Sequence, residues 1–368
     1  MAAACPMSSP RSFALCLALL ACCPAFGQNP DTTARLTWSG YVEPYFSYDA
    51  HQPASGDRPP FFYSFQRHNE VNINVGFLKA AYTAPRTRAN VALAAGTYMN
   101  ANYAAEPGVL RNILEMNAGL RLSKRHELWV DAGVFGSHIG FESAVGKDCR
   151  TLSRSLLAEN SPYYEAGAKI TYNSPSGRWL LSGLLLNGWQ HIQRVSGSSL
   201  PSFGTQVQYK PSASVTLNSS TFVGADQPDT LRQMRYFHNL YGIFQIGTRW
   251  EATVGFDIGW QQARRHSSDY HTWYTPIGIL RYAASSQLAF AGRAEYYRDR
   301  EGVIIATGTP DGFGVLGSSI TLDYALLPNA LWRMEARWLH STGDAIFSRN
   351  GTARRDNAFF TTSLAVGF

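Results

Sequence analysis

Hydrophobic and polar residues alternate along much of the chain with a period of two, which is the period of a β-strand. From Trp250 to Trp260 the even positions carry Trp, Ala, Val, Phe, Ile and Trp, and the odd positions carry Glu, Thr, Gly, Asp and Gly. At about 3.3 Å per residue and a tilt of about 40°, the two Trp residues lie roughly 25 Å apart along a membrane normal. This spacing is typical of the two aromatic belts on a membrane-spanning strand, whereas soluble strands average about five or six residues.

The same alternation recurs in other segments. Segment 331–340 places Trp and Met on one face and Arg333, Glu335 and Arg337 on the other, and segment 287–297 places Arg293 on its polar face. The pattern predicts sixteen strands, near 35–49, 66–83, 89–101, 110–122, 127–137, 162–173, 178–188, 203–210, 214–224, 234–246, 249–261, 271–283, 287–298, 316–327, 331–341 and 357–368. In segment 71–77 it predicts that Val71, Ile73, Val75 and Phe77 share one face.

The connections alternate in length between these strands. Short ones such as 247–248 and 328–330 are rich in Gly, Pro, Asn and Ser, whose backbone preferences suit turns. Long ones lie between them, and the longest runs from 137 to 161. The pattern predicts an all-β protein, a transmembrane antiparallel β-barrel with short periplasmic turns and long extracellular loops.

The last predicted strand is amphipathic and ends on Phe368. A terminal apolar strand can close the barrel, so that no open sheet edge faces lipid. We expect the cellular barrel-assembly machinery to engage this strand, and lipids of the outer membrane to surround the barrel.

The N-terminal segment has the features of an export signal. Arg11 precedes an apolar stretch, 13–23, that is too short to span a bilayer, and small residues flank Phe26. We expect cleavage before Gln28, which leaves one domain, 28–368, in the outer membrane of a Gram-negative bacterium. Lipoprotein processing at Cys22 is the alternative.

Composition supports a barrel over other classes. Charged residues make up 16% of the chain, against about 25% in soluble domains. The mean hydropathy of −0.19 is too low for a bundle of apolar helices. Four of the five Cys residues lie in the N-terminal signal, which leaves Cys149 and no internal disulfide. The net charge of +6 is scattered, so nucleic acid is not an expected partner, and no cofactor or metal is expected.

About sixteen strands enclose a lumen wide enough for water, which predicts a channel for small hydrophilic solutes. We expect the third long loop, 137–161, to fold into the lumen and narrow it; a flap over the mouth is the alternative. Charges near a constriction set ion preference. The candidate constriction and lumen residues are Glu142, Lys147, Asp148, Arg150, Arg154, Glu159, Arg293, Arg333, Glu335 and Arg337. The arginines among them favour a mild anion preference.

The sequence in and around this loop resembles that of a known family. The segments 136–143, 152–167 and 186–189 are similar to the central signature of the β-barrel porin-2 (OmpL-like) family. The resemblance spans most of the chain after the signal, and it implies an outer-membrane porin without enzymatic activity. Cys149 departs from the polar or aromatic residue that is common at its position.

Two alternative functions remain open from the sequence. The barrel could be a platform for surface binding or adhesion, with a lumen plugged by the third loop. It could be an outer-membrane hydrolase, because His340, Ser341 and Asp344 cluster at the end of one strand. A homotrimer is suggested by analogy with general porins.

Overall fold

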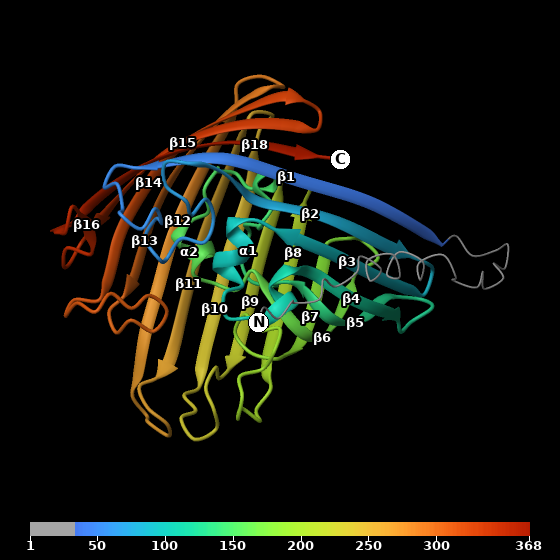
Figure 1. Ribbon diagram of the computed structural model, residues 1–368. Coiled ribbons are helices and arrows are strands. Elements are labelled where there is room, and N and C mark those ends of the chain that lie inside the picture. The colour runs from blue at the N-terminus through green and yellow to red at the C-terminus, as the bar shows by residue number, and fades with distance from the viewer. Residues whose placement is uncertain (1–33) are drawn as a thin grey trace, which may run out of the picture.

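The computed structural model describes residues 34–368, in which sixteen antiparallel strands form a closed barrel (Figure 1). This confirms the predicted architecture. The barrel strands are β1 (Arg35–Asp49), β2 (Val71–Thr83), β3 (Thr87–Ala95), β4 (Ile113–Arg121), β5 (Glu127–Gly136), β6 (Tyr164–Asn173), β7 (Trp179–Leu186), β8 (Ser202–Ser212), β9 (Val215–Gly224), β10 (Arg235–Ile246), β11 (Trp250–Gln262), β12 (Tyr270–Ala283), β13 (Leu288–Asp299), β14 (Phe313–Leu327), β15 (Ala330–Ser341) and β18 (Asp356–Gly367). Pairing of β1 with both β2 and β18 closes the wall.

Short turns and long loops alternate around the barrel, as predicted. The long loops are L1 (50–70), L2 (96–112), L3 (137–163), L4 (187–201), L5 (225–234), L6 (263–269), L7 (300–312) and L8 (342–355). They contain the helices α1 (Thr97–Asn102) and α2 (Leu156–Glu159), the 3-10 turns η2 (Gly108–Asn112) and η3 (Gly146–Asp148), and the hairpin β16 (Phe347–Arg349) and β17 (Thr352–Arg354). All long loops lie at one end of the barrel, which we call the outer end.

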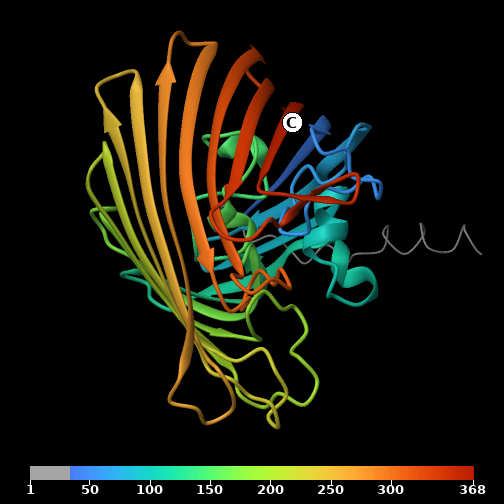
Figure 2. The same cartoon turned by 90° about the vertical axis from the view of Figure 1, so that its left-hand side faces the viewer.

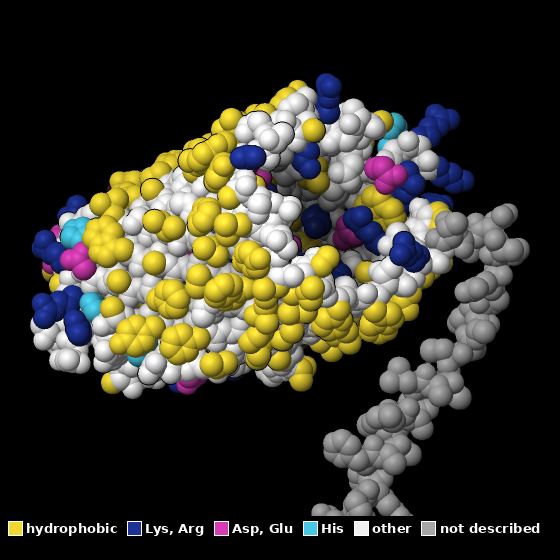
Figure 3. All heavy atoms as spheres, turned by 90° about the horizontal axis from the view of Figure 1, so that it is seen from above, with side chains coloured by type: hydrophobic (Ala, Val, Ile, Leu, Met, Phe, Trp, Pro, Cys, Tyr) yellow, Lys and Arg dark blue, Asp and Glu magenta, His cyan; other side chains and the backbone are white. Residues whose placement is uncertain are grey.

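The outer wall is apolar because every second residue of each strand faces away from the lumen. Trp250 and Trp260, at opposite ends of β11, are 43% and 36% exposed, as expected for side chains in two aromatic belts. Figure 3 shows hydrophobic side chains over this wall and a hollow with charged side chains inside it. Among the described residues, no helix is long and apolar enough to cross a membrane. The predicted export signal and its cleavage point lie outside the described residues.

A β-bulge in β2 contradicts the predicted common face of segment 71–77. Val71 and Ile73 are 78% and 37% exposed on the outer wall, whereas Val75 is completely buried inside. The pairing of β2 with β1 shifts register here, so that two residues of β2 lie opposite Glu43 alone. A bulge exchanges the faces of all residues beyond it, which a regular alternation cannot predict. Asn74 faces inward, as the alternation before the bulge predicts, and its amide donates to the Glu43 carboxylate at 3.0 Å.

The predicted boundaries of the strands around L2 are also wrong. The strand expected at 89–101 ends at Ala95, and α1 follows, because Gly96 adopts a φ of +136° that turns the chain inward. A Cβ at this position would lie 2.4 Å from the carbonyl oxygen of Asn74, so the turn requires glycine. L2 therefore folds into the barrel, where Figures 1 and 2 place α1 within the curve of the strands.

Candidate functional site

Loop L3 lies inside the barrel against β13, β14 and β15. Arg333 of β15 donates to the carbonyl oxygens of Gly146 and Cys149 at 2.6 and 3.1 Å. Arg293 of β13 donates to the carbonyl oxygen of Ser153 at 2.7 Å. These bonds are charge-assisted and buried, so they hold the backbone of L3 directly on the wall, without an open gap between loop and arginines.

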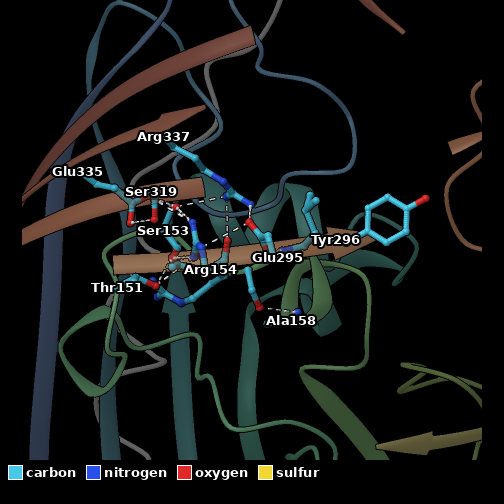
Figure 4. A network of polar contacts seen from close by, with 12 residues as sticks. Thr151, Ser153, Arg154, Ala158, Glu295, Tyr296, Ser319, Glu335 and Arg337 are labelled. Carbon is cyan, nitrogen blue, oxygen red and sulfur yellow. Dashed lines mark hydrogen bonds and ion pairs between the residues drawn. The ribbon is translucent and has the colours of Figure 1, made fainter. Parts of the chain in front are cut away.

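Carboxylates complete this network (Figure 4). Arg337 donates to the carbonyl oxygen of Arg154 at 2.9 Å and to Glu295 at 2.6 Å. Glu295 also accepts from the backbone N–H of Leu156 at 2.6 Å, which places α2. Glu335 accepts from the hydroxyl of Ser153 in L3 and from the hydroxyl of Thr321 in β14. The positive charges of Arg293, Arg333 and Arg337 are therefore matched by acidic side chains beside them.

The predicted charged residues of L3 have different surroundings. Arg154 is buried and donates to carbonyl oxygens of its own loop. Glu142 accepts from the backbone N–H and hydroxyl of Ser155. Lys147 and Asp148 are exposed on η3.

Two further charged residues connect L3 to other parts of the lumen. Arg150 forms an ion pair with Glu251 of β11. Glu159 accepts from the backbone N–H groups of Tyr63 and Ser64 in L1, with a bond of 2.9 Å from Tyr63. Burial raises the pKa of Glu159 to about 7. L1 is therefore fastened to the outer side of L3.

The inward face near the outer end of the barrel is apolar, which the sequence analysis did not identify. One buried cluster, the outer apolar core, joins residues of nine barrel strands between β5 and β18 with residues of L1, L3, L7 and L8. Its members are Phe61, Phe62, Phe135, Ile139, Leu156, Leu184, Leu186, Phe222, Phe237, Trp273, Tyr297, Ile305, Phe313, Val315, Leu339, Phe347 and Phe359. A second cluster unites Tyr41, Val75, Ala94, Tyr98, Met99, Tyr103, Tyr164 and Ala365. Loops and wall thus pack together over much of the lumen at this level.

Two separate cavities lie between L2 and the end of L3, and no residue lines both of them. The outer cavity, about 390 Å³, is lined by residues of L1, L2, L3, L4 and L7 together with Arg235 and Tyr164. The inner cavity, about 220 Å³, lies beneath α1 and is lined by Glu115, Glu142 and Tyr163 among others. A larger hollow of about 650 Å³ is lined mainly by outward-facing residues of β11 to β15, so most of it faces lipid.

The cluster His340, Ser341 and Asp344 does not have the geometry of a catalytic triad. His340 lies on the outer wall, where it stacks on Trp338 and contacts Asp356 at 2.9 Å. Ser341 points to the opposite face and donates to the backbone oxygen of Asp344. Adjacent residues of a strand face opposite sides, so these groups cannot meet around one substrate.

Residues of L1, L2 and L4 also build the site, and the sequence analysis assigned them no role. Glu106 of L2 accepts from the Tyr164 hydroxyl at 3.1 Å and from the backbone N–H of Ile192 at 2.7 Å. Gln190 of L4 accepts from the backbone N–H of Tyr163 at 2.7 Å. These contacts join loops that are distant in sequence, so no local pattern could have revealed them.

A closed barrel with an apolar outer wall and loops folded inward defines an outer-membrane channel of the porin class. The chain belongs to the β-barrel porin-2, OmpL-like family, whose model matches residues 35–368. No curated protein matches the sequence.

Solved porin structures share the fold at low sequence identity. The anion-selective porin from Comamonas acidovorans is 10% identical with a TM-score of 0.60, over 91% of this chain and 100% of that one. OmpT of Vibrio cholerae is 10% identical with a TM-score of 0.57, over 91% and 98%. The outer membrane channel DcaP of Acinetobacter baumannii is 11% identical with a TM-score of 0.56, over 91% and 97%.

Proposed function

We propose that the protein is a passive diffusion channel for small hydrophilic solutes. The observation that supports this most is the pair of cavities between L2 and L3, because each leaves space for a small solute beside the packed loops. Their volumes of about 390 and 220 Å³ favour single small molecules over polymers. No catalytic step belongs to this proposal.

The expected anion preference depends on charges that solutes can reach. Arg293, Arg333 and Arg337 are at most 3% exposed and are bonded to L3 and to carboxylates. A paired and buried guanidinium contributes little net potential to a water-filled path. We therefore propose that any ion preference comes from exposed charges such as Lys147 and Asp148 of η3, and that it is weak because the two have opposite signs.

Planar-bilayer recording and liposome swelling test the channel together. We expect stepwise conductance, and swelling rates that fall steeply with the size of a graded series of sugars. The reversal potential in a KCl gradient should lie close to zero. Absence of both conductance and swelling, with correctly folded protein, would contradict the proposal.

A barrel used as a platform for surface binding is the second candidate. The outer apolar core favours it, because residues from opposite walls and four loops pack into one cluster, as in a plug. This candidate predicts that the intact protein does not conduct. Deleting residues 145–158 should then open a channel that the intact protein lacks.

We also propose the remaining cellular features from the sequence. Export would depend on the segment 1–27, and assembly on β18, which ends beside Phe368. A homotrimer is proposed by analogy with general porins. One solved structure of OmpT from Vibrio cholerae is of its trimer form. Chemical crosslinking and mass photometry in detergent would test the trimer.

A further inference from the structure

The outer cavity has the features of a site for one small ligand. Its volume of about 390 Å³ falls in the range of ligand pockets, about 300–1,000 Å³. Five different loops and strand ends contribute to it, and its rim residues Ala104 and Ala105 are exposed. It lies on the outer side of L3, where a solute arriving from outside the cell meets the barrel first.

The charged groups of the outer cavity are already paired, which argues against a charged ligand. The Arg235 guanidinium donates to Asp226 at 2.8 Å and to Gln261 at 2.7 Å. Both carboxylate oxygens of Glu159 accept backbone N–H groups of L1. The Nε2 atom of His191 lies 3.9 Å from the Oδ1 atom of Asp226. An anionic or cationic ligand would therefore have to compete with existing partners, whereas an uncharged ligand would not.

Aromatic side chains and hydrogen-bonding groups lie side by side in this cavity. Tyr63 and Trp189 line it and are half-buried, whereas Tyr164 also lines it but is buried, with its ring stacked on Tyr103 at 3.9 Å. Tyr63 carries a hydroxyl and Trp189 an indole N–H, which are the two groups of this lining that could donate to a ligand from an aromatic ring. A ligand that fits needs an apolar face for the rings and hydroxyls at its edge. Sugar rings meet both needs, because their C–H bonds form a positively polarised face that packs on an aromatic ring.

We propose that the outer cavity binds one neutral sugar ring. The volume equals that of about thirteen water molecules at about 30 Å³ each, which suits the twelve heavy atoms of a hexose. At about −0.3 kcal/mol per heavy atom, the dissociation constant is about 1 mM, which allows a solute to bind and leave quickly. The site adds a solute class, neutral sugars, to the proposed channel function. Binding itself does not depend on that function, and only the passage that follows binding rests on it.

Isothermal titration of the purified barrel in detergent tests the site without a membrane. Glucose and methyl glucoside should bind saturably at about 1 mM. Gluconate, glucosamine and open-chain sorbitol should bind at least 10-fold more weakly, because they add a charge or lack the ring face. Trp189→Phe should weaken glucose binding about 10-fold or more, since it removes the indole N–H and part of the ring. Tyr63→Phe keeps the ring and should weaken glucose binding less than Trp189→Phe does.

Trp338→Phe is the matched control, because Trp338 is 44% exposed on the outer wall. It should bind glucose as the unmodified protein does, and all variants should show the heat-modifiable gel mobility of a folded barrel. Equal binding of glucose, gluconate and sorbitol would overturn the site, as would unchanged affinity in folded Trp189→Phe and Tyr63→Phe. Binding without liposome swelling would refute the channel alone, and swelling without saturable binding would refute the sugar site alone.

Discussion

The attachment of L3 to the wall can be weakened by one substitution, Arg333→Met. Arg333 is completely buried and makes two charge-assisted bonds to L3, to the carbonyl oxygens of Gly146 and Cys149. Each bond of this kind contributes about 1.5–3 kcal/mol. The variant also leaves Asp323 without its partner, which was held at 2.7 Å. We therefore expect the closed position of L3 to lose at least about 3 kcal/mol relative to a detached position.

Cys149 reports this change directly. It is 5% exposed, its thiol is hydrogen-bonded within L3, and it is the free cysteine of residues 34–368. Burial raises the pKa of the Cys149 thiol, which makes the closed loop unreactive toward maleimide. If labelling requires detachment, a loss of about 3 kcal/mol accelerates it about 150-fold. Mass spectrometry of the labelled peptide identifies Cys149 as the modified residue.

Arg88→Met is the matched control for this experiment. Arg88 pairs with Asp131 at 2.7 Å, so the control also breaks a wall ion pair, but one between β3 and β5. Its labelling rate at Cys149 should stay within about threefold of the unmodified rate, which corresponds to less than about 1 kcal/mol. A folded Arg333→Met barrel whose Cys149 reacts no faster than this control would refute the anchoring role.

Other parts of the structure support three further predictions. Because the pKa of Glu159 is raised to about 7 from the 4.5 of a free side chain, the folded state binds an extra proton between these values, so stability falls as pH rises through this window. Thermal denaturation should show a free energy of unfolding that is higher at pH 5 than at pH 8 by at most about 3 kcal/mol, and Glu159→Gln should remove this difference. A higher stability at pH 8 would contradict the prediction. Gly167→Ala should lower the denaturation temperature or prevent assembly, because φ is +152° and a Cβ would lie 2.0 Å from a β7 carbonyl oxygen. Gly183→Ala is the control and should have a mild effect, since the atom nearest to its added Cβ is 3.6 Å away. Ile320→Arg on the lipid face should lower the stability of the barrel folded into liposomes by about 2–4 kcal/mol, whereas Leu327→Arg at the end of β14 should lower it by about 0–1 kcal/mol. Equal costs of the two substitutions would argue against the assigned membrane position.

The sequence by itself determined the barrel. Lipid outside and water or packed side chains inside impose an alternation of period two, and β11 carries it without interruption between Trp250 and Trp260. Turn residues and loop lengths then fixed the strand count and the side on which the loops lie. These are local properties, so sixteen strands could be read from one chain. The resemblance around 152–167 supplied the family, which the match over 35–368 confirms.

Only the tertiary structure decided what fills the lumen. The inward turn at Gly96 and the bulge opposite Glu43 depend on close approach between neighbouring strands. The joining of L1 to Glu159 and of Arg333 to Gly146 pairs residues about 95 and 187 positions apart. Alternation states which side a residue faces, but whether water, a loop or another wall lies on that side depends on how distant segments meet. For this reason the arginines could be placed inside the barrel from the sequence, while their partners and the outer cavity could not.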